Sequence, residues 1–190
     1  MEGCVAHVLL ACDYGRLDRN QTKQDWQTIG PHTVARLEGA IAAAGPNDFF
    51  CVSAGRLQSD HALLWELQRA YLIKKGIQLN RILHPEPNAG TWGTKDELRY
   101  AQSRLVRPEV DCCAVQVWTE DYHRRRTRLY AWQIEFSVTV IGVDSSSFPP
   151  TREERLHEYC ALISICAPRS FRKGLKKWNN RRRQRMYTAE

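Results

Sequence analysis

Apolar and polar positions along the chain follow two different periods. Short runs rich in Val, Ile, Leu, Phe and Cys, bounded by polar residues, predict strands that are buried on both faces. These runs cover residues 5–11, 49–53, 81–84, 112–118 and 137–143. In other segments apolar residues recur three and four positions apart, which predicts helices. The helical segments are centred on residues 34–41, 64–71, 98–105, 129–132 and 156–163.

The alternation of strands and helices predicts βαβ units and therefore a parallel sheet. The expected fold class is α/β, a three-layer Rossmann-like sandwich with a mostly parallel sheet of about five strands. With the strand order 3-2-1-4-5, the topological switch point lies between the first and fourth strands, and ligands of such sheets bind there. The polar stretch at residues 13–32 is expected to be a long loop.

Composition narrows the class of protein. The chain has 190 residues, of which 43% are hydrophobic, as in a soluble globular protein. It has no apolar run near the roughly 20 residues of a membrane helix. Its seven cysteines are odd in number and form no C-x-x-C pair, so we expect reduced packing residues, no metal site and a cytoplasmic location.

The positive charge is concentrated at the C-terminal end. Residues 169–190 hold nine of the 28 Lys and Arg and one of the 21 Asp and Glu, which leaves 19 basic and 20 acidic residues before them. The chain therefore divides into a nearly neutral α/β domain, residues 1–168, and a basic C-terminal extension, residues 169–190. That extension suits nucleic acid or an anionic membrane surface, or it is simply a solvated terminus.

Candidate site residues lie where the predicted strands end. Asp13 follows the first strand, and the segment Thr119–Arg126 follows the fourth. His123 titrates near neutral pH and Arg126 can clamp an anion, so we expect His123 and Asp13 to be catalytic. The expected ligand-binding residues are Ser53, Gly55, Glu86, Thr94, Asp121 and Arg126. Asp13 has an equally good interpretation as a solvated loop acid, and Thr94 with Glu97 as a helix capping box.

The usual nucleotide motifs are missing. No G-x-G-x-x-G follows the first strand, and the sequence has no P-loop and no G-x-S-x-G. Ordinary dinucleotide-binding, P-loop and α/β-hydrolase classes are therefore disfavoured.

Four segments carry a family resemblance. Ser53-Ala-Gly55, Ala70-Tyr-Leu with Ile77, Thr94-x-x-Glu97-Leu-x-Tyr-Ala101 and Thr119-Glu-Asp-Tyr-His-Arg-Arg-Arg126 resemble, in order and spacing, motifs of the YdcF/SanA/ElyC-like family. Glu97 and Glu120 depart from that pattern, where the family has Asn and Ser. The resemblance implies a Rossmann-like sheet, and one family member is associated with S-adenosylmethionine, which makes that compound a candidate cofactor.

Two functions follow as expectations. The first is a YdcF-like protein that binds a small anionic, nucleotide-like ligand, S-adenosylmethionine included, with hydrolase or transferase chemistry. The second is a non-catalytic interaction protein that binds nucleic acid or an anionic membrane surface through residues 169–190.

Overall fold

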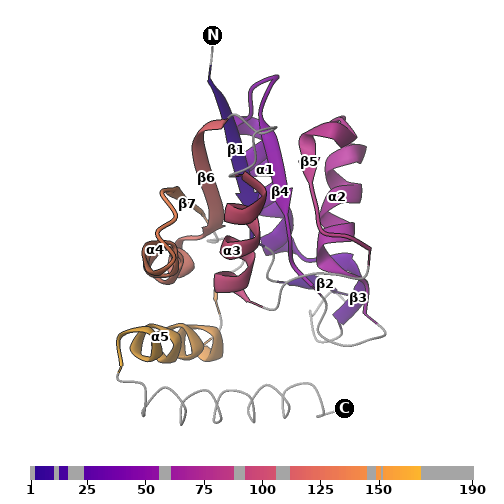
Figure 1. Cartoon of the computed structure of the whole chain (residues 1–190). Coiled ribbons are helices and arrows are strands. Elements are labelled where there is room, and N and C mark those ends of the chain that lie inside the picture. The colour runs from indigo at the N-terminus through magenta and orange to yellow at the C-terminus, as the bar shows by residue number, and fades with distance from the viewer. Residues whose placement is uncertain are drawn as a thin grey trace. The chain divides into compact units, whose positions relative to one another are not determined.

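The computed structural model describes residues 3–10, 13–16, 24–55, 61–87, 93–105, 112–144, 149–150 and 152–167. Contacts within the chain divide it into two units, Met1–Pro149 and Pro150–Glu190. The first unit holds the sheet (Figure 1). In the second, the structure describes helix α5, Arg152–Cys166. The basic extension at residues 169–190 lies outside the described residues.

The sheet has five parallel strands in the order β5-β4-β1-β6-β7. Its strands are β1 Cys4–Leu9, β4 Phe49–Val52, β5 Ile82–Leu83, β6 Cys112–Glu120 and β7 Thr139–Val143. The predicted α/β class and mostly parallel sheet of about five strands are confirmed, and the order is the 3-2-1-4-5 arrangement for which a switch point between the first and fourth strands was considered. Strand β6 runs two residues further than the apolar pattern predicted, because Thr119 and Glu120 pair with Gly142 and Val143 of β7.

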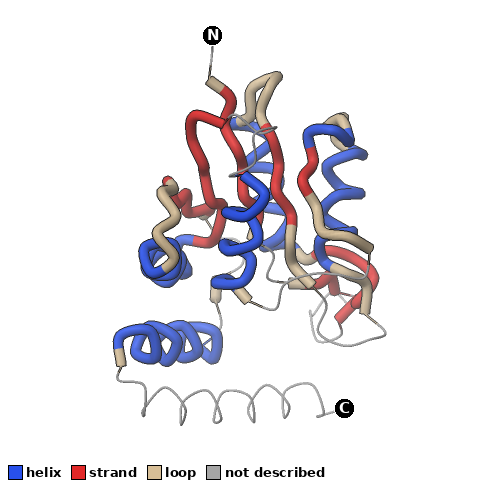
Figure 2. Tube along the Cα trace, in the orientation of Figure 1, coloured by secondary structure: helices blue, strands red, loops and turns tan. Residues whose placement is uncertain are grey.

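Helices cover both faces of the sheet, as the blue segments of Figure 2 show. Helices α1, Pro31–Ala43, and α2, Leu64–Lys74, pack on one face with short helix η1, Leu79–Arg81, leading into β5. Helices α3, Thr94–Leu105, and α4, Arg124–Gln133, pack on the other, and η2, Asp121–His123, precedes α4. The result is a Rossmann-like three-layer sandwich.

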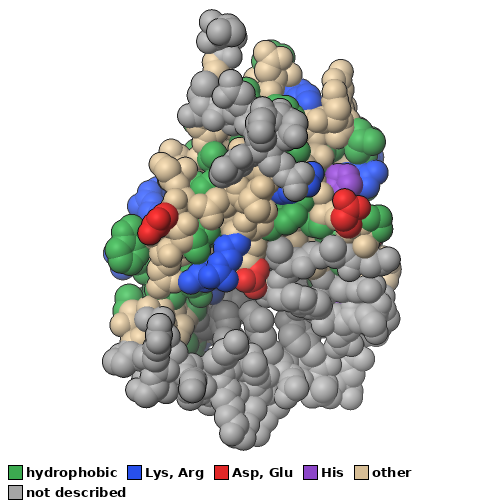
Figure 3. All heavy atoms as spheres, in the orientation of Figure 1, with side chains coloured by type: hydrophobic (Ala, Val, Ile, Leu, Met, Phe, Trp, Pro, Cys, Tyr) green, Lys and Arg blue, Asp and Glu red, His purple; other side chains and the backbone are tan. Residues whose placement is uncertain are grey.

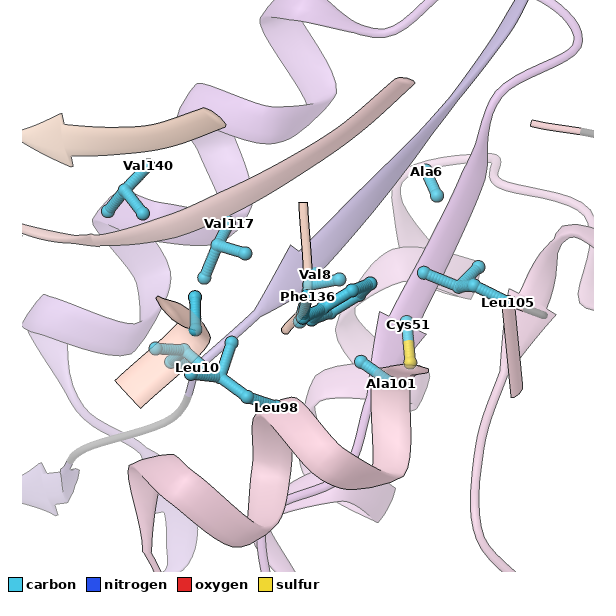
Figure 4. Packing of buried hydrophobic residues seen from close by; sticks show 11 residues of the cluster. Ala6, Val8, Leu10, Cys51, Leu98, Ala101, Leu105, Val117, Phe136 and Val140 are labelled. Carbon is cyan, nitrogen blue, oxygen red and sulfur yellow. The ribbon is translucent and has the colours of Figure 1, made fainter. Parts of the chain in front are cut away.

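The two-residue period of β1 divides the core between these faces. Ala6, Val8 and Leu10 point into the cluster under α3 and α4, which Figure 4 shows together with Leu98 and Val117. The intervening Leu9 belongs to the cluster under α1 and α2. Because β1 is buried on both faces, it reads in the sequence as an apolar run interrupted only by His7.

The stretch expected to be a long loop contains a hairpin. Strands β2, Tyr14–Arg16, and β3, Gln24–Ile29, pair antiparallel within residues 13–32. The loop prediction was wrong because most residues of this hairpin are polar, since one of its faces lies in water. Only a few apolar side chains hold the hairpin, so the sequence shows no clear strand pattern. Tyr14 is 1% exposed and packs edge-on against Trp26 and His61.

A buried polar network links β1 and β6 to the turn that precedes β4. Trp118 Nε1 donates to His7 Nδ1 at 3.1 Å, which leaves the proton on His7 Nε2, 3.1 Å from Asp48 Oδ2. Asp48 also accepts from the backbone N–H of Val5 and Gly45, each at 2.8 Å. Burial lowers the pKa of His7 below its ordinary 6.5, although Asp48 opposes this shift.

The His7 network predicts how stability depends on pH. A histidine whose folded pKa is depressed costs stability once the pH falls below its unfolded pKa, because the unfolded chain then binds more protons. Between pH 7.5 and 5.5 the parent should lose more free energy of unfolding than His7→Gln, which keeps a donor and an acceptor but cannot titrate. The excess is bounded at about 1.4 kcal/mol per pH unit, the value for one proton. Urea unfolding at three pH values measures it, and parallel profiles for the two proteins would contradict the assignment.

The surface of the sheet-bearing unit is mixed in charge. On the face drawn in Figure 3, acidic and basic side chains of the described residues are scattered among polar and apolar ones. No helix in the described ranges is long and apolar enough to cross a membrane.

Candidate functional site

The candidate site lies at the carboxyl ends of β1 and β6. These two strands are neighbours, yet the chain leaves β1 toward α1 on one face and leaves β6 toward α4 on the other. The strand order thus reverses between them, and this is where open α/β sheets place a ligand crevice.

A buried ion pair closes the inner end of this site. The guanidinium of Arg36 donates to Glu120 Oε2 and also to the backbone carbonyl of Leu10. Both charged side chains are 2% exposed. The pair therefore connects α1 to the ends of β1 and β6, and it satisfies two acceptors that water does not reach.

Two imidazoles flank the same carboxylate. His32 Nδ1 lies 3.6 Å from Glu120 Oε1, and His123 Nε2 lies 4.0 Å from Glu120 Oε2. Each imidazole side chain is 14% exposed, so each lies between the buried carboxylate and solvent. We call His32, Arg36, Glu120 and His123 the carboxylate cluster.

Arg126 fixes the tautomer of His123. Its NH2 group lies 3.1 Å from His123 Nδ1, and since a guanidinium can only donate, Nδ1 accepts and the imidazole proton lies on Nε2. That proton then faces Glu120. Tyr122 packs against the His123 ring with centroids 4.0 Å apart, which restricts its rotation.

Asp13 acts on the beginning of α1. Its carboxylate accepts from the backbone N–H of Thr33 at 2.9 Å and of His32 at 3.2 Å, and from the Thr33 hydroxyl at 2.8 Å. These N–H groups would otherwise lack a partner in the first turn, and the positive end of the helix dipole favours the carboxylate. Gly30 permits the approach, because a Cβ at this position would overlap the Asp13 carboxylate and the Tyr14 carbonyl oxygen.

The other expected site residues all follow strands of the sheet or begin a helix. They are spread along the carboxyl edge of the sheet and do not gather at one point. Ser53 and Gly55 are buried after β4, and Leu64 N–H donates to the Gly55 carbonyl at 3.1 Å. Glu86 is exposed beyond β5, at the far edge of the sheet. Asp121 is exposed, and its Oδ1 is 3.2 Å from Arg124 NH1, over Gly142 of β7.

Thr94 is the first residue of α3 and not its cap. The carbonyl of Gly93 accepts from the N–H of Asp96 and of Glu97, so Gly93 holds the N-cap position. The expected Thr94–Glu97 capping box was therefore wrong. Glu97 is instead 4% exposed beneath α3.

The hairpin covers the part of the edge that lies next to β4. Trp26 and His61 stack at 4.0 Å with a 7° angle between their rings, and the Tyr14 hydroxyl donates to the Ala62 carbonyl at 2.8 Å. Tyr14 also packs against Ala54, directly after Ser53. Ser53 and Gly55 are thereby buried, whereas His32 and His123 remain partly open to solvent.

Sequence reasoning missed His32, Arg36 and Glu120. His32 and Arg36 are four residues apart and so share one face of α1, a relation visible in the sequence once the helix start is placed at Pro31. Glu120 lies two residues after Trp118, on the same face of β6. Its burial was not predictable, because an Asp or Glu after a strand is ordinarily exposed.

The sequence matches no protein-family model, no curated protein and no solved structure. No group of His, Cys, Asp and Glu among the described residues could hold a metal ion. The fold and the carboxylate cluster thus define an α/β protein of Rossmann-like architecture with a buried carboxylate, flanked by two partly exposed histidines, at its switch point.

The ion pair predicts strong coupling between its partners. Arg36→Met and Glu120→Gln should each lower the free energy of unfolding by about 3–5 kcal/mol, because each leaves a buried charge without its partner. The double variant should cost clearly less than the sum, since it leaves no buried charge. Urea unfolding of the four proteins gives the coupling energy, and additive costs would contradict a direct pair.

The Asp13 cap predicts unequal effects at two N-cap glycines. Gly30→Ala should displace the Asp13 carboxylate and cost roughly the 0.5–2 kcal/mol of a lost cap. Gly93→Ala is the matched control, because a Cβ there meets nothing within 4 Å. Thermal or urea unfolding compares them, and an equal cost at both glycines would argue against the cap.

Proposed function

We propose that the edge between β1 and β6 binds a small anionic, nucleotide-like ligand. The observation that supports this most is the carboxylate cluster with Arg126 beside it, at the switch point of the sheet. Ionisable groups gathered at a partly open edge of this kind are enriched at functional sites. S-adenosylmethionine is one candidate, on the family resemblance alone.

Arg126 is the proposed anion-binding group. A guanidinium matches a carboxylate or phosphate with two parallel hydrogen bonds. In the described structure Arg126 donates to His123 Nδ1. An anion that binds the Arg126 guanidinium would replace this hydrogen bond, and His123 Nδ1 could then accept a proton from the ligand. Ligand binding and the exposure of a proton acceptor would then be one event.

His123 is the proposed group that moves a proton, and Glu120 orients it. A buried carboxylate facing one imidazole nitrogen stabilises the proton there and directs the other nitrogen outward. This arrangement suits hydrolase or transferase chemistry, in which a proton leaves an attacking hydroxyl or reaches a leaving group. Because both carboxylate oxygens of Asp13 accept from α1, we assign Asp13 a positioning role in this proposal.

A second candidate function rests on the charge distribution. Residues 169–190 carry nine basic residues and one acidic residue, whereas residues 1–168 are nearly neutral. A non-catalytic protein that binds nucleic acid or an anionic membrane through this extension would show steeply salt-dependent binding. Deletion of residues 169–190 would abolish such binding and leave ligand binding at the switch point unchanged.

The ligand proposal predicts separable effects of two substitutions. A thermal-shift screen of nucleotides, S-adenosylmethionine and sugar phosphates should identify a compound that raises the melting temperature of the parent. For that compound, Arg126→Ala should weaken binding about 10- to 100-fold, the loss of one charge-assisted contact. His123→Ala should largely keep binding and lose turnover.

Arg99→Ala is the control for the screen. Arg99 is an exposed arginine on the neighbouring helix α3, 3.9 Å from Asp96, and it should change neither binding nor turnover. Calorimetry measures binding, and product analysis measures turnover, for the parent and the Arg126→Ala, His123→Ala and Arg99→Ala variants. Equal losses of binding in all three variants, or no stabilising compound in the screen, would remove the ligand proposal.

A further inference from the structure

The outward face of α4 carries a feature that the carboxylate cluster does not use. Helix α4 packs inward through Thr127 and Ala131, which are 0% and 3% exposed. Arg125, Arg128 and Trp132 fall on the opposite side, since they are three, four and seven residues apart. We call these three side chains the α4 outer face.

Trp132 is 77% exposed, the most exposed large hydrophobic side chain among those that the structure describes. A tryptophan normally buries most of its ring, because that ring contributes a large transfer free energy. A single exposed hydrophobic side chain is common on protein surfaces, so the significance of Trp132 depends on the charged side chains beside it.

The charge on this face is unbalanced. Arg125 and Arg128 are both exposed, and neither has an ion pair with a described residue. Their neighbours on α4 are engaged, since Arg124 pairs with Asp121 and Arg126 contacts His123. Helix α4 contains no Asp or Glu, so its outer face offers positive charge to an anionic partner.

We propose that the α4 outer face binds single-stranded nucleic acid. A base stacks on the flat indole of Trp132, and the two guanidinium groups contact phosphates of the same strand. Arg125 and Trp132 are separated by about 10 Å along the helix axis, which corresponds to roughly three nucleotides at stacked spacing. The surface therefore matches one stacked base with its neighbouring phosphates.

Other anionic partners fit the same surface less well. A membrane-surface helix needs a continuous apolar face, whereas Trp132 is the single exposed large hydrophobic residue within α4. A duplex keeps its bases stacked on one another, so it offers no ring to the indole. An acidic peptide matches the arginines but has no planar partner for Trp132.

The test separates base stacking from phosphate contact in the full-length chain. The probe is a fluorescently labelled 12-nucleotide mixed-sequence single strand, and binding is followed by anisotropy at several salt concentrations. Trp132→Leu should weaken binding about 5- to 150-fold, the range for the loss of one stacked base. Trp132→Phe keeps a flat ring and should retain most of the affinity. If the contact were merely apolar, the Leu and Phe variants would bind equally well.

The arginines have a separate readout. Arg125→Ala with Arg128→Ala should reduce the magnitude of the salt slope by about 1.4, because two phosphate contacts to a single strand are lost. The control is Arg69→Ala with Lys74→Ala on α2, which removes equal charge from the other face of the sheet and should leave the slope near the parent value.

Four outcomes would overturn the proposal. They are the absence of measurable binding, equal affinity of the parent and Trp132→Leu, equal losses in the Leu and Phe variants, and equal salt slopes for the two double variants. Competition by the matching duplex, by anionic phospholipid vesicles or by a poly-glutamate peptide at the same effective concentration as the unlabelled single strand would also refute it. None of these results bears on the ligand proposed for the switch point, so the two proposals fail independently.

Discussion

The buried pair of Arg36 and Glu120 holds the carboxyl edge of the sheet together. Removing two charges from water is expensive, and the cost is offset here because the guanidinium serves the Leu10 carbonyl as well as the carboxylate. The pair joins α1, β1 and β6, three elements that are far apart in sequence. Its geometry also dictates that of the histidines, because His32 lies one helical turn before Arg36 and His123 three residues after Glu120. The partly exposed His32 and His123 are thus positioned by an ion pair that solvent does not reach.

The two-residue period of β6 connects this edge with the opposite one. Trp118 and Glu120 point to the same face, toward α1. Trp118 donates to His7, which belongs to the network at the amino end of β1, and Glu120 meets Arg36 at the carboxyl end. A slip of β6 by one residue would turn both side chains to the α3 face and leave two buried polar groups without partners. Polar contacts therefore specify the register that apolar packing alone would fix less strictly.

The sequence predicted the frame better than the site. Strand runs and helical spacing predicted about five strands and their parallel direction, because these depend on burial patterns that are repeated along the chain. The hairpin of β2 and β3 was missed because its stability depends on the stacking of Trp26 on His61, a contact between distant segments. Glu120 was missed for the same physical reason: only its pairing with Arg36, 84 residues away, makes a buried carboxylate tolerable. Of the expected site residues, the structure connects Asp13, His123 and Arg126 to the carboxylate cluster, through the backbone of His32 and the side chain of Glu120.

Asp13 changes how this edge can recognise an anion. In many nucleotide-binding α/β folds the first helix points its free N–H groups at a phosphate. Here those of His32 and Thr33 are taken by a carboxylate of the protein itself, held close by the absence of a side chain at Gly30. The sequence after β1 correspondingly lacks the glycine-rich motif that lets a phosphate approach the backbone at this turn. The proposed anion recognition between β1 and β6 would then fall to a side chain, and Arg126 is one that contacts His123. In the proposed function an anion on Arg126 would compete directly with His123 Nδ1, so that charge recognition and proton transfer would be coupled through a single hydrogen bond.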